Sequence, residues 1–165
     1  MTASPFGRYA PGGDDEPLHP VRLLNLPVRV LVDERERHDS MLREFALLAL
    51  DAQARPLPPG LAELAQAFGV RYATARSRPD APVDEAVQQG TAAIDVTYDV
   101  PVSVLETVER LERLMAEADD FCRSEQLLTL PRNALQLRFD TWYFEQFRRQ
   151  LAGEPAQPWD GPLEP

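Results

Sequence analysis

Apolar residues recur at intervals of three and four over three long stretches of the chain, which is the spacing of one face of an α-helix. These stretches predict helices over residues 27–52, 101–124 and 131–152. Two shorter segments, 21–26 and 93–98, are rich in aliphatic and β-branched residues, and the second alternates them with polar ones. Both predict strands. Because no further strand is expected, we predict that these two pair with each other.

Local signals predict two shorter helices and several helix ends. One short helix is expected to end at Gly69 and another at Gly90, because glycine is common just beyond a helix. Ser103 and Glu106 have the spacing of a capping box for the second long helix, and Thr129 is a candidate N-cap for the last one.

One short phrase occurs twice, 74 positions apart. Residues 26–31 (LPVRVL) and 100–105 (VPVSVL) match at four of six positions, and each lies between a predicted strand and a long helix. Proline is tolerated in the first turn of a helix. The repeat indicates either a duplicated strand–helix–helix unit, with halves over 21–90 and 91–152, or local syntax shared by any such junction. Both readings give a mainly α fold: a helical bundle with two short strands.

The two ends of the chain differ from its middle. Residues 1–20 and 153–165 are rich in proline and lack periodicity, which predicts a disordered N-terminal tail and a proline-rich C-terminal tail around one domain over 21–152. Trp159 is either a clip that folds the tail onto the body or a short docking motif. The clip is favoured, because an exposed tryptophan in a mobile tail is unproductive.

Charge and cysteine content limit the function classes. All 17 basic residues are arginine, and the net charge of −10 disfavours nucleic acids and anionic membranes as partners. The longest apolar run, 45–50, is too short to span a bilayer, and the N-terminus lacks the apolar core of a signal peptide. A single cysteine, Cys122, excludes an internal disulfide. We therefore expect an acidic cytoplasmic protein.

Catalytic motifs are scarce in the sequence. It contains no glycine-rich phosphate loop and no Gly-x-Ser-x-Gly elbow, and Cys122 falls on an apolar stripe, where a buried, inert thiol is expected. Residues 33–37 and the carboxylates of the second long helix are expected to form solvated charged faces. No cofactor is predicted, and the chain is expected not to be an enzyme.

A metal site is a weak alternative. Glu34 and His38 are four residues apart on the first long helix, so both can face one ion, with Asp119 as a third ligand from the second long helix. The favoured interpretation of His38 is a surface or half-buried side chain stabilised by a helical carboxylate.

The last predicted helix is the one basic element of an acidic chain, and it is rich in aromatic residues. Three consecutive rings, Trp142 to Phe144, point about 100° apart, so one packed face cannot bury all of them. Either its own domain surrounds the helix, or some rings remain for a partner. The candidate partner-binding residues are Arg138, Trp142, Tyr143, Arg148, Arg149 and Trp159.

Several stretches resemble a group of small actinobacterial proteins encoded near partner-switching regulators of the anti-sigma-factor and serine-phosphatase type. The resemblance covers about residues 21–153. It is carried by the segments 26–28, 41–50, 118–123, 127–130 and 142–147. These segments hold packing residues, so the resemblance implies no catalytic residue. It implies a regulatory role in sigma-factor control.

Two functions follow as hypotheses. The leading one is a non-enzymatic regulatory or protein-interaction module that binds a protein partner through the last helix. The alternative is a small-molecule- or metal-binding helical domain with a pocket between the two halves. A structural homodimer is a third possibility.

Overall fold

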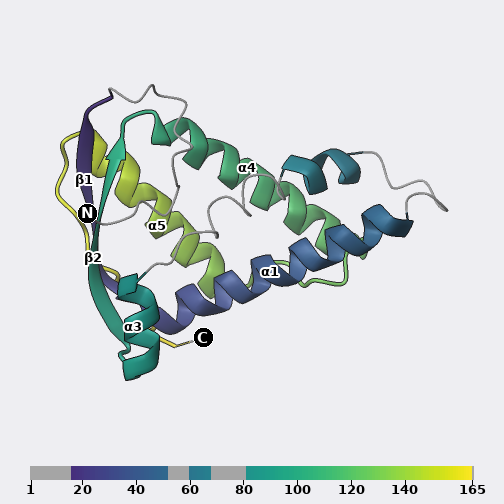
Figure 1. Cartoon of the computed structure of the whole chain (residues 1–165), viewed down its shortest axis with the longest axis horizontal. Coiled ribbons are helices and arrows are strands. Elements are labelled where there is room, and N and C mark those ends of the chain that lie inside the picture. Colours follow the sequence, from purple (N-terminus) through teal and green to yellow (C-terminus); the bar gives the residue numbers. More distant parts are fainter. Residues whose placement is uncertain (1–15, 52–59, 68–80, 165) are drawn as a thin grey trace.

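The chain folds into a mainly α structure with one two-stranded sheet, as predicted (Figure 1). The computed structural model describes residues 16–51, 60–67 and 81–164. In chain order the elements are β1 (Leu18–Pro27), α1 (Val28–Asp51), a short helix over 61–67, α3 (Ala81–Gln89), β2 (Ala93–Pro101), α4 (Val104–Arg123) and α5 (Ala134–Leu151). The predicted helix end at Gly69 and most of the predicted N-terminal tail lie outside the described residues.

The two strands pair with each other in antiparallel orientation, from Leu18 opposite Pro101 to Pro27 opposite Ala93. Period-2 alternation buries one face of the sheet. The buried residues of that face are Val21, Leu23, Leu26, Val96, Tyr98 and Val100. β1 is longer than predicted: it includes residues 18–20, for which the sequence predicts a disordered tail.

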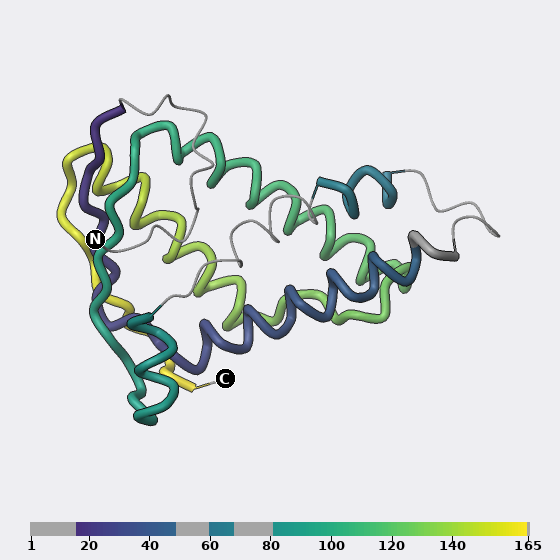
Figure 2. Tube along the Cα trace, viewed as in Figure 1, coloured from purple at the N-terminus to yellow at the C-terminus, as the bar shows by residue number. Residues whose placement is uncertain are grey.

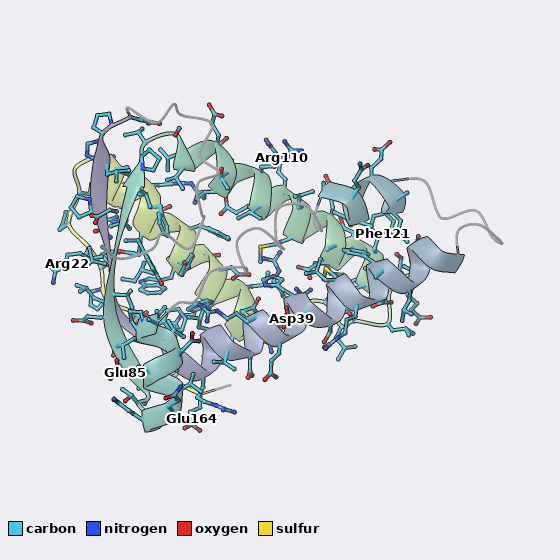
Figure 3. The ribbon with its side chains drawn as sticks, in the orientation of Figure 1. Arg22, Asp39, Glu85, Arg110, Phe121 and Glu164 are labelled. Atoms are coloured by element: carbon cyan, nitrogen blue, oxygen red, sulfur yellow. The ribbon has the colours of Figure 1, made fainter. Side chains whose placement is uncertain are left out.

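The helices lie to one side of the sheet, and α5 packs against β1 (Figure 1). The faces of the strands and helices that point away from the core are exposed to solvent. Arg22 on β1 and Arg110 on α4 lie on such faces (Figure 3). The core joins the buried face of the sheet to the inner faces of α1, α4 and α5.

Both copies of the repeated phrase lie at strand-to-helix junctions. Pro27 is the last residue of β1 and Pro101 the last of β2, so each proline closes a strand instead of sitting inside a helix. α1 begins at Val28, and α4 begins at Val104. The two copies of the phrase therefore play the same structural role, because each ends a strand and precedes a long helix. Duplication of the whole strand–helix–helix unit stays a prediction.

Ser103 is the N-cap residue of α4, but the predicted capping box with Glu106 is not formed, and Thr129 is not the cap of α5. Ser103 makes no side-chain cap bond to its own helix. Its N–H and hydroxyl donate to the carboxylate of Glu16 (2.9 and 2.5 Å), and these bonds lower the pKa of Glu16. α5 is capped by Asn133 in a capping box with Gln136, not by Thr129.

No helix in the described part of the chain is long and apolar enough to cross a membrane.

Candidate functional site

A group of charged and polar side chains is buried where α1, α4, α5 and the α4–α5 connection meet. We call it the buried charged cluster. Its members are Glu34, Arg37, His38, Asp119, Arg132 and Asp140. Sequence reasoning placed residues 33–37 and the α4 carboxylates on solvated faces. That expectation is wrong for Glu34, Arg37 and Asp119, whose side chains are at most 8% exposed.

Asp119 holds the cluster together. One of its oxygens accepts from Arg37 Nη2 (2.7 Å) and from the backbone N–H of Arg132 (2.9 Å), and the other accepts from Arg132 Nε (2.7 Å). Arg132 Nη1 donates onward to Asp140 Oδ2 (2.8 Å). Charge-assisted bonds of this kind are what make buried charges tolerable. These hydrogen bonds thereby fix the start of α5 to both α1 and α4.

Burial suppresses the charges of the two remaining members. It raises the pKa of Glu34 to about 8, helped by the nearby Asp140 carboxylate. It lowers the pKa of His38 to about 3, helped by the positive charges of Arg37 and Arg132. His38 Nε2 lies 3.8 Å from Glu34 Oε2, too far for a hydrogen bond. At neutral pH both side chains are therefore uncharged.

The structure brings the three candidate metal ligands, Glu34, His38 and Asp119, into one neighbourhood but gives Asp119 a different task. Both of its oxygens already accept from the guanidinium groups of Arg37 and Arg132. Among the described residues, no three histidine, cysteine, aspartate or glutamate side chains are grouped to hold a metal ion. The arrangement is that of an ion-pair network.

Arg37, Arg132 and Asp140 were missed from the sequence. A signal for the cluster was present: the apolar stripe of the first helix stops after Val32 and resumes at Met41. A helix that is buried on both sides of such a gap must bury polar side chains within it.

The connection between α4 and α5 presents a second feature, a pair of exposed leucines. Leu128 is 92% exposed and Leu130 is 78% exposed, although Leu127 beside them is buried. Leu47 on α1 is also 66% exposed. We call Leu47, Leu128 and Leu130 the leucine patch.

The backbone beneath these leucines is fixed. The Glu44 carboxylate, one helical turn before Leu47, accepts from the N–H groups of Leu128 and Thr129 and from the Thr129 hydroxyl, the last two at 2.9 and 2.8 Å. The carbonyl of Leu130 accepts from Arg37 Nε (3.2 Å). The connection therefore runs alongside α1, away from the sheet (Figure 2).

Three of the six candidate partner-binding residues lie together, where the chain's own C-terminal segment meets α5. Trp159 is buried, with ring centroids 5.8 Å from Phe139 and 5.5 Å from Trp142. Arg138 lies over the Trp159 ring (5.3 Å) and pairs with Asp160 (2.8 Å). Of the two interpretations of Trp159, the structure shows the clip, and residues 153–164 pack on the body instead of forming a free tail.

The other three candidates also have partners within the chain. Tyr143 packs on Phe147, with ring centroids 5.4 Å apart. Arg148 pairs with Glu112, and Arg149 pairs with Glu154 (2.7 Å). The aromatic face of α5 is therefore largely covered.

Cys122 is buried, and burial raises the pKa of its thiol. A protonated, buried thiol is a poor nucleophile.

No protein-family model matches the chain, and no curated protein or solved structure matches it either. Its function is therefore inferred from its own geometry.

Proposed function

We propose that the protein is a non-enzymatic regulatory module that binds a partner protein through the leucine patch. One observation carries this proposal: the backbone of Leu128 and Leu130 is tied to Glu44 and Arg37, while both side chains are held in solvent. Exposed leucines add nothing to folding stability. Apolar surface that is exposed and preorganised is typical of docking sites, because little freedom is lost on binding.

The cysteine and the one histidine in the buried charged cluster do not have the properties of catalytic groups. Cys122 is protonated and buried, and His38 is neutral and sealed within the buried charged cluster. A general acid or base must reach its substrate and titrate near the working pH. Neither group meets that requirement.

The proposed partner presents an apolar groove with a positively charged rim. The chain carries a net charge of −10, and Glu125, three residues before Leu128, is exposed. Opposite charge at the rim speeds encounter and selects the partner, while the leucines supply the buried contact. The resemblance to actinobacterial proteins near anti-sigma factors and serine phosphatases supports a partner in sigma-factor control.

The test begins by identifying the partner with a photoreactive residue at position 128 of the full chain, introduced in the cell that makes the protein. The captured protein is then purified, and its affinity is measured by calorimetry against Leu128→Asp/Leu130→Asp. Burying one leucine side chain stabilises a complex by about 1.5–3 kcal/mol, so the double variant should bind at least about tenfold more weakly.

Val87→Asp is the matched control, because Val87 is a half-exposed apolar residue on α3, away from the patch. It should bind like the wild type. Equal affinity of the leucine variant and the wild type would overturn the proposal.

The small-molecule or metal alternative is favoured by a single observation. Both oxygens of Glu34 are buried without a hydrogen-bond partner among the described residues. Elemental analysis of the purified chain tests its metal form: stoichiometric metal that is lost in Glu34→Gln would support it, and metal-free protein would remove it.

A further inference from the structure

The C-terminal segment, residues 157–162, is bound to the body of the protein as a peptide ligand would be. Figure 2 shows this end of the chain, in yellow, passing beside β1. The N–H of Trp159 donates to the carbonyl of Leu24 (2.9 Å), and the carbonyl of Trp159 accepts from Asn25 Nδ2 (2.8 Å). Asn25 has φ 56°, a left-handed conformation that asparagine tolerates better than most residues. Leu24 and Asn25 lie between Leu23 and Leu26, where the pairing of β1 with β2 is irregular, and they offer Trp159 one acceptor and one donor.

Side chains of α5 bind the main chain of Gln157, two residues before Trp159. The N–H of Gln157 donates to Gln146 Oε1 (2.8 Å), and its carbonyl accepts from Trp142 Nε1 (3.0 Å). Both main-chain groups of two alternate residues, Gln157 and Trp159, are therefore bonded to the body. Three of these four bonds are made by side chains of the body, and one is made by the backbone carbonyl of Leu24.

Side chains supply the sequence preference. The Trp159 ring is 2% exposed and meets Phe139 and Trp142 edge-on, while the Arg138 guanidinium lies over it. The same guanidinium pairs with Asp160 (2.8 Å). One arginine therefore reads both the aromatic residue and the acid that follows it.

The next two residues shape the segment around the tryptophan. A Cβ at Gly161 would lie 2.2 Å from Trp159 Cζ2, so only glycine fits there. The indole N–H of Trp159 donates to the carbonyl of Pro162 (2.9 Å). The ligand is thus specified as Trp-Asp-Gly-Pro, preceded by a residue bonded through its main chain.

The link to α5 plays no part in these contacts. The N–H groups of Gly153 and Glu154 donate to the carbonyls of Gln150 and Arg149, which complete the end of the helix. Every contact of residues 157–162 described above would form equally well with a segment that came from another chain.

We infer that the surface made by Leu24, Asn25, Arg138, Phe139, Trp142 and Gln146 binds the C-terminal segment of a second copy of this chain, so that two copies can join by exchanging these segments. The occupant is a second copy because the chain itself carries the fully complementary sequence. This inference goes beyond the proposed function and does not depend on the leucine patch.

Tethering decides which form prevails. A short link holds the segment near its own surface at an effective concentration in the millimolar range, so the closed single chain dominates in dilute solution. Exchange makes the same contacts twice and costs mainly the freedom of the second chain. The paired form should therefore appear when closure within one chain is prevented.

Two full-length variants with complementary defects provide the test. Trp159→Ala keeps the binding surface but loses the anchor. Asn25→Gly/Trp142→Leu keeps the segment but damages the surface, and glycine preserves the positive φ at position 25. Each variant alone should sediment as one chain of about 18.6 kDa, and their mixture should give a one-to-one species of twice that mass.

The matched control adds Trp159→Ala to the second variant, which then offers no segment and should give no paired species. Adding Leu128→Asp/Leu130→Asp to both partners should leave the pairing unchanged, which separates this inference from the proposed function. A mixture that stays at the one-chain mass, while circular dichroism shows both variants folded, would overturn the inference.

A peptide covers the case in which Trp159→Ala does not fold alone. A synthetic peptide of residues 154–165 should then restore its helical circular dichroism, and the same peptide with alanine at position 159 should not. Failure of the unaltered peptide to restore the fold would also overturn the inference.

Discussion

The two surfaces that flank α5 differ in composition and in accessibility. On one side, α5 carries five aromatic residues, yet its rings pack on one another and on Trp159, which the returning C-terminal segment brings back. On the other side, the short connection before α5 has no ring, yet it holds Leu128 and Leu130 almost fully in solvent. A segment rich in apolar residues is therefore not by itself an exposed surface. Whether its side chains are buried or exposed depends on which other segments of the chain pack over them.

The two sides are also held by different forces. The C-terminal side relies on ring contacts and main-chain hydrogen bonds, whereas the α4–α5 connection relies on charges: Asp119 binds the backbone and side chain of Arg132, and Glu44 binds the backbone of Leu128. Substitutions in the two regions should therefore lower the stability of the fold by different amounts and for different reasons.

The largest expected effect comes from Asp119→Ala. It leaves the guanidinium groups of Arg37 and Arg132 without their shared carboxylate, and breaking a buried pair in this way costs about 3–5 kcal/mol. Urea denaturation should show this loss in the free energy of unfolding. Asp120→Ala is the matched control, because the neighbouring Asp120 side chain is 77% exposed, and it should change stability by less than about 0.5 kcal/mol. Similar values for the two variants would refute the role given to Asp119.

Trp159→Ala should have the next largest effect. Truncation of a buried tryptophan costs about 3 kcal/mol or more, and the lower figure is expected here because the chain end can move away. The change should appear as a lower urea midpoint. Pro158→Ala serves as the control, since Pro158 is exposed, and it should leave the midpoint nearly unchanged. A wild-type midpoint for Trp159→Ala would mean that the clip does not stabilise the fold.

The buried charged cluster predicts a pH dependence of stability. The folded protein holds the Glu34 proton up to a pKa of about 8, whereas the unfolded chain releases it near 4.5, so stability is lost as the pH rises between these values. His38 acts in the opposite direction, mainly below its ordinary pKa of 6.5, and Asp140, with a pKa raised to about 6, is largely ionised above pH 7.

Between pH 7 and 8 the Glu34 contribution is therefore the main one within the cluster. At about 1.4 kcal/mol per pH unit, falling off as the pH reaches the folded pKa, the wild type should lose about 1 kcal/mol over this range. Glu34→Gln, which cannot ionise, should show a flat profile when the free energy of unfolding is measured at each pH. An equal slope in both proteins would show that Glu34 does not carry the dependence.

The smallest effect on stability is expected at the leucine patch. Leu128→Asp/Leu130→Asp alters side chains that lie in solvent, so the free energy of unfolding should change by less than about 0.5 kcal/mol. Combined with the loss of partner binding proposed above, this would mark a docking surface. A loss of several kcal/mol would instead show that these leucines are buried in the folded protein.

The sequence predicted most of the fold because its elements follow from local pattern. The period of three and four located α1, α4 and α5 to within a few residues, and the alternation in β2 revealed both the strand and its buried face. The antiparallel direction of the pair, and the extension of β1 to Leu18, depend on contacts between distant segments. Local pattern does not carry that information.

The candidate site was harder to predict for the same reason. Helical spacing predicted that Glu34 and His38 face the same way, and Asp119 was a candidate partner from the second long helix. Arg132 joins them only because the α4–α5 connection folds back over Asp119. The exposure of Leu128 was not foreseen, since a leucine in a short apolar run is ordinarily assigned to the core. Its exposure follows from the bonds that Glu44 makes to the backbone.

The most direct test of the docking proposal compares photoreactive residues at positions 128 and 142 of the full chain in the cell that makes it. The account predicts that position 128 attaches to another protein, whereas position 142, on the covered face of α5, attaches only within a chain of this protein or to a second copy of it. Attachment of position 142 to a different protein, with none from position 128, would contradict it.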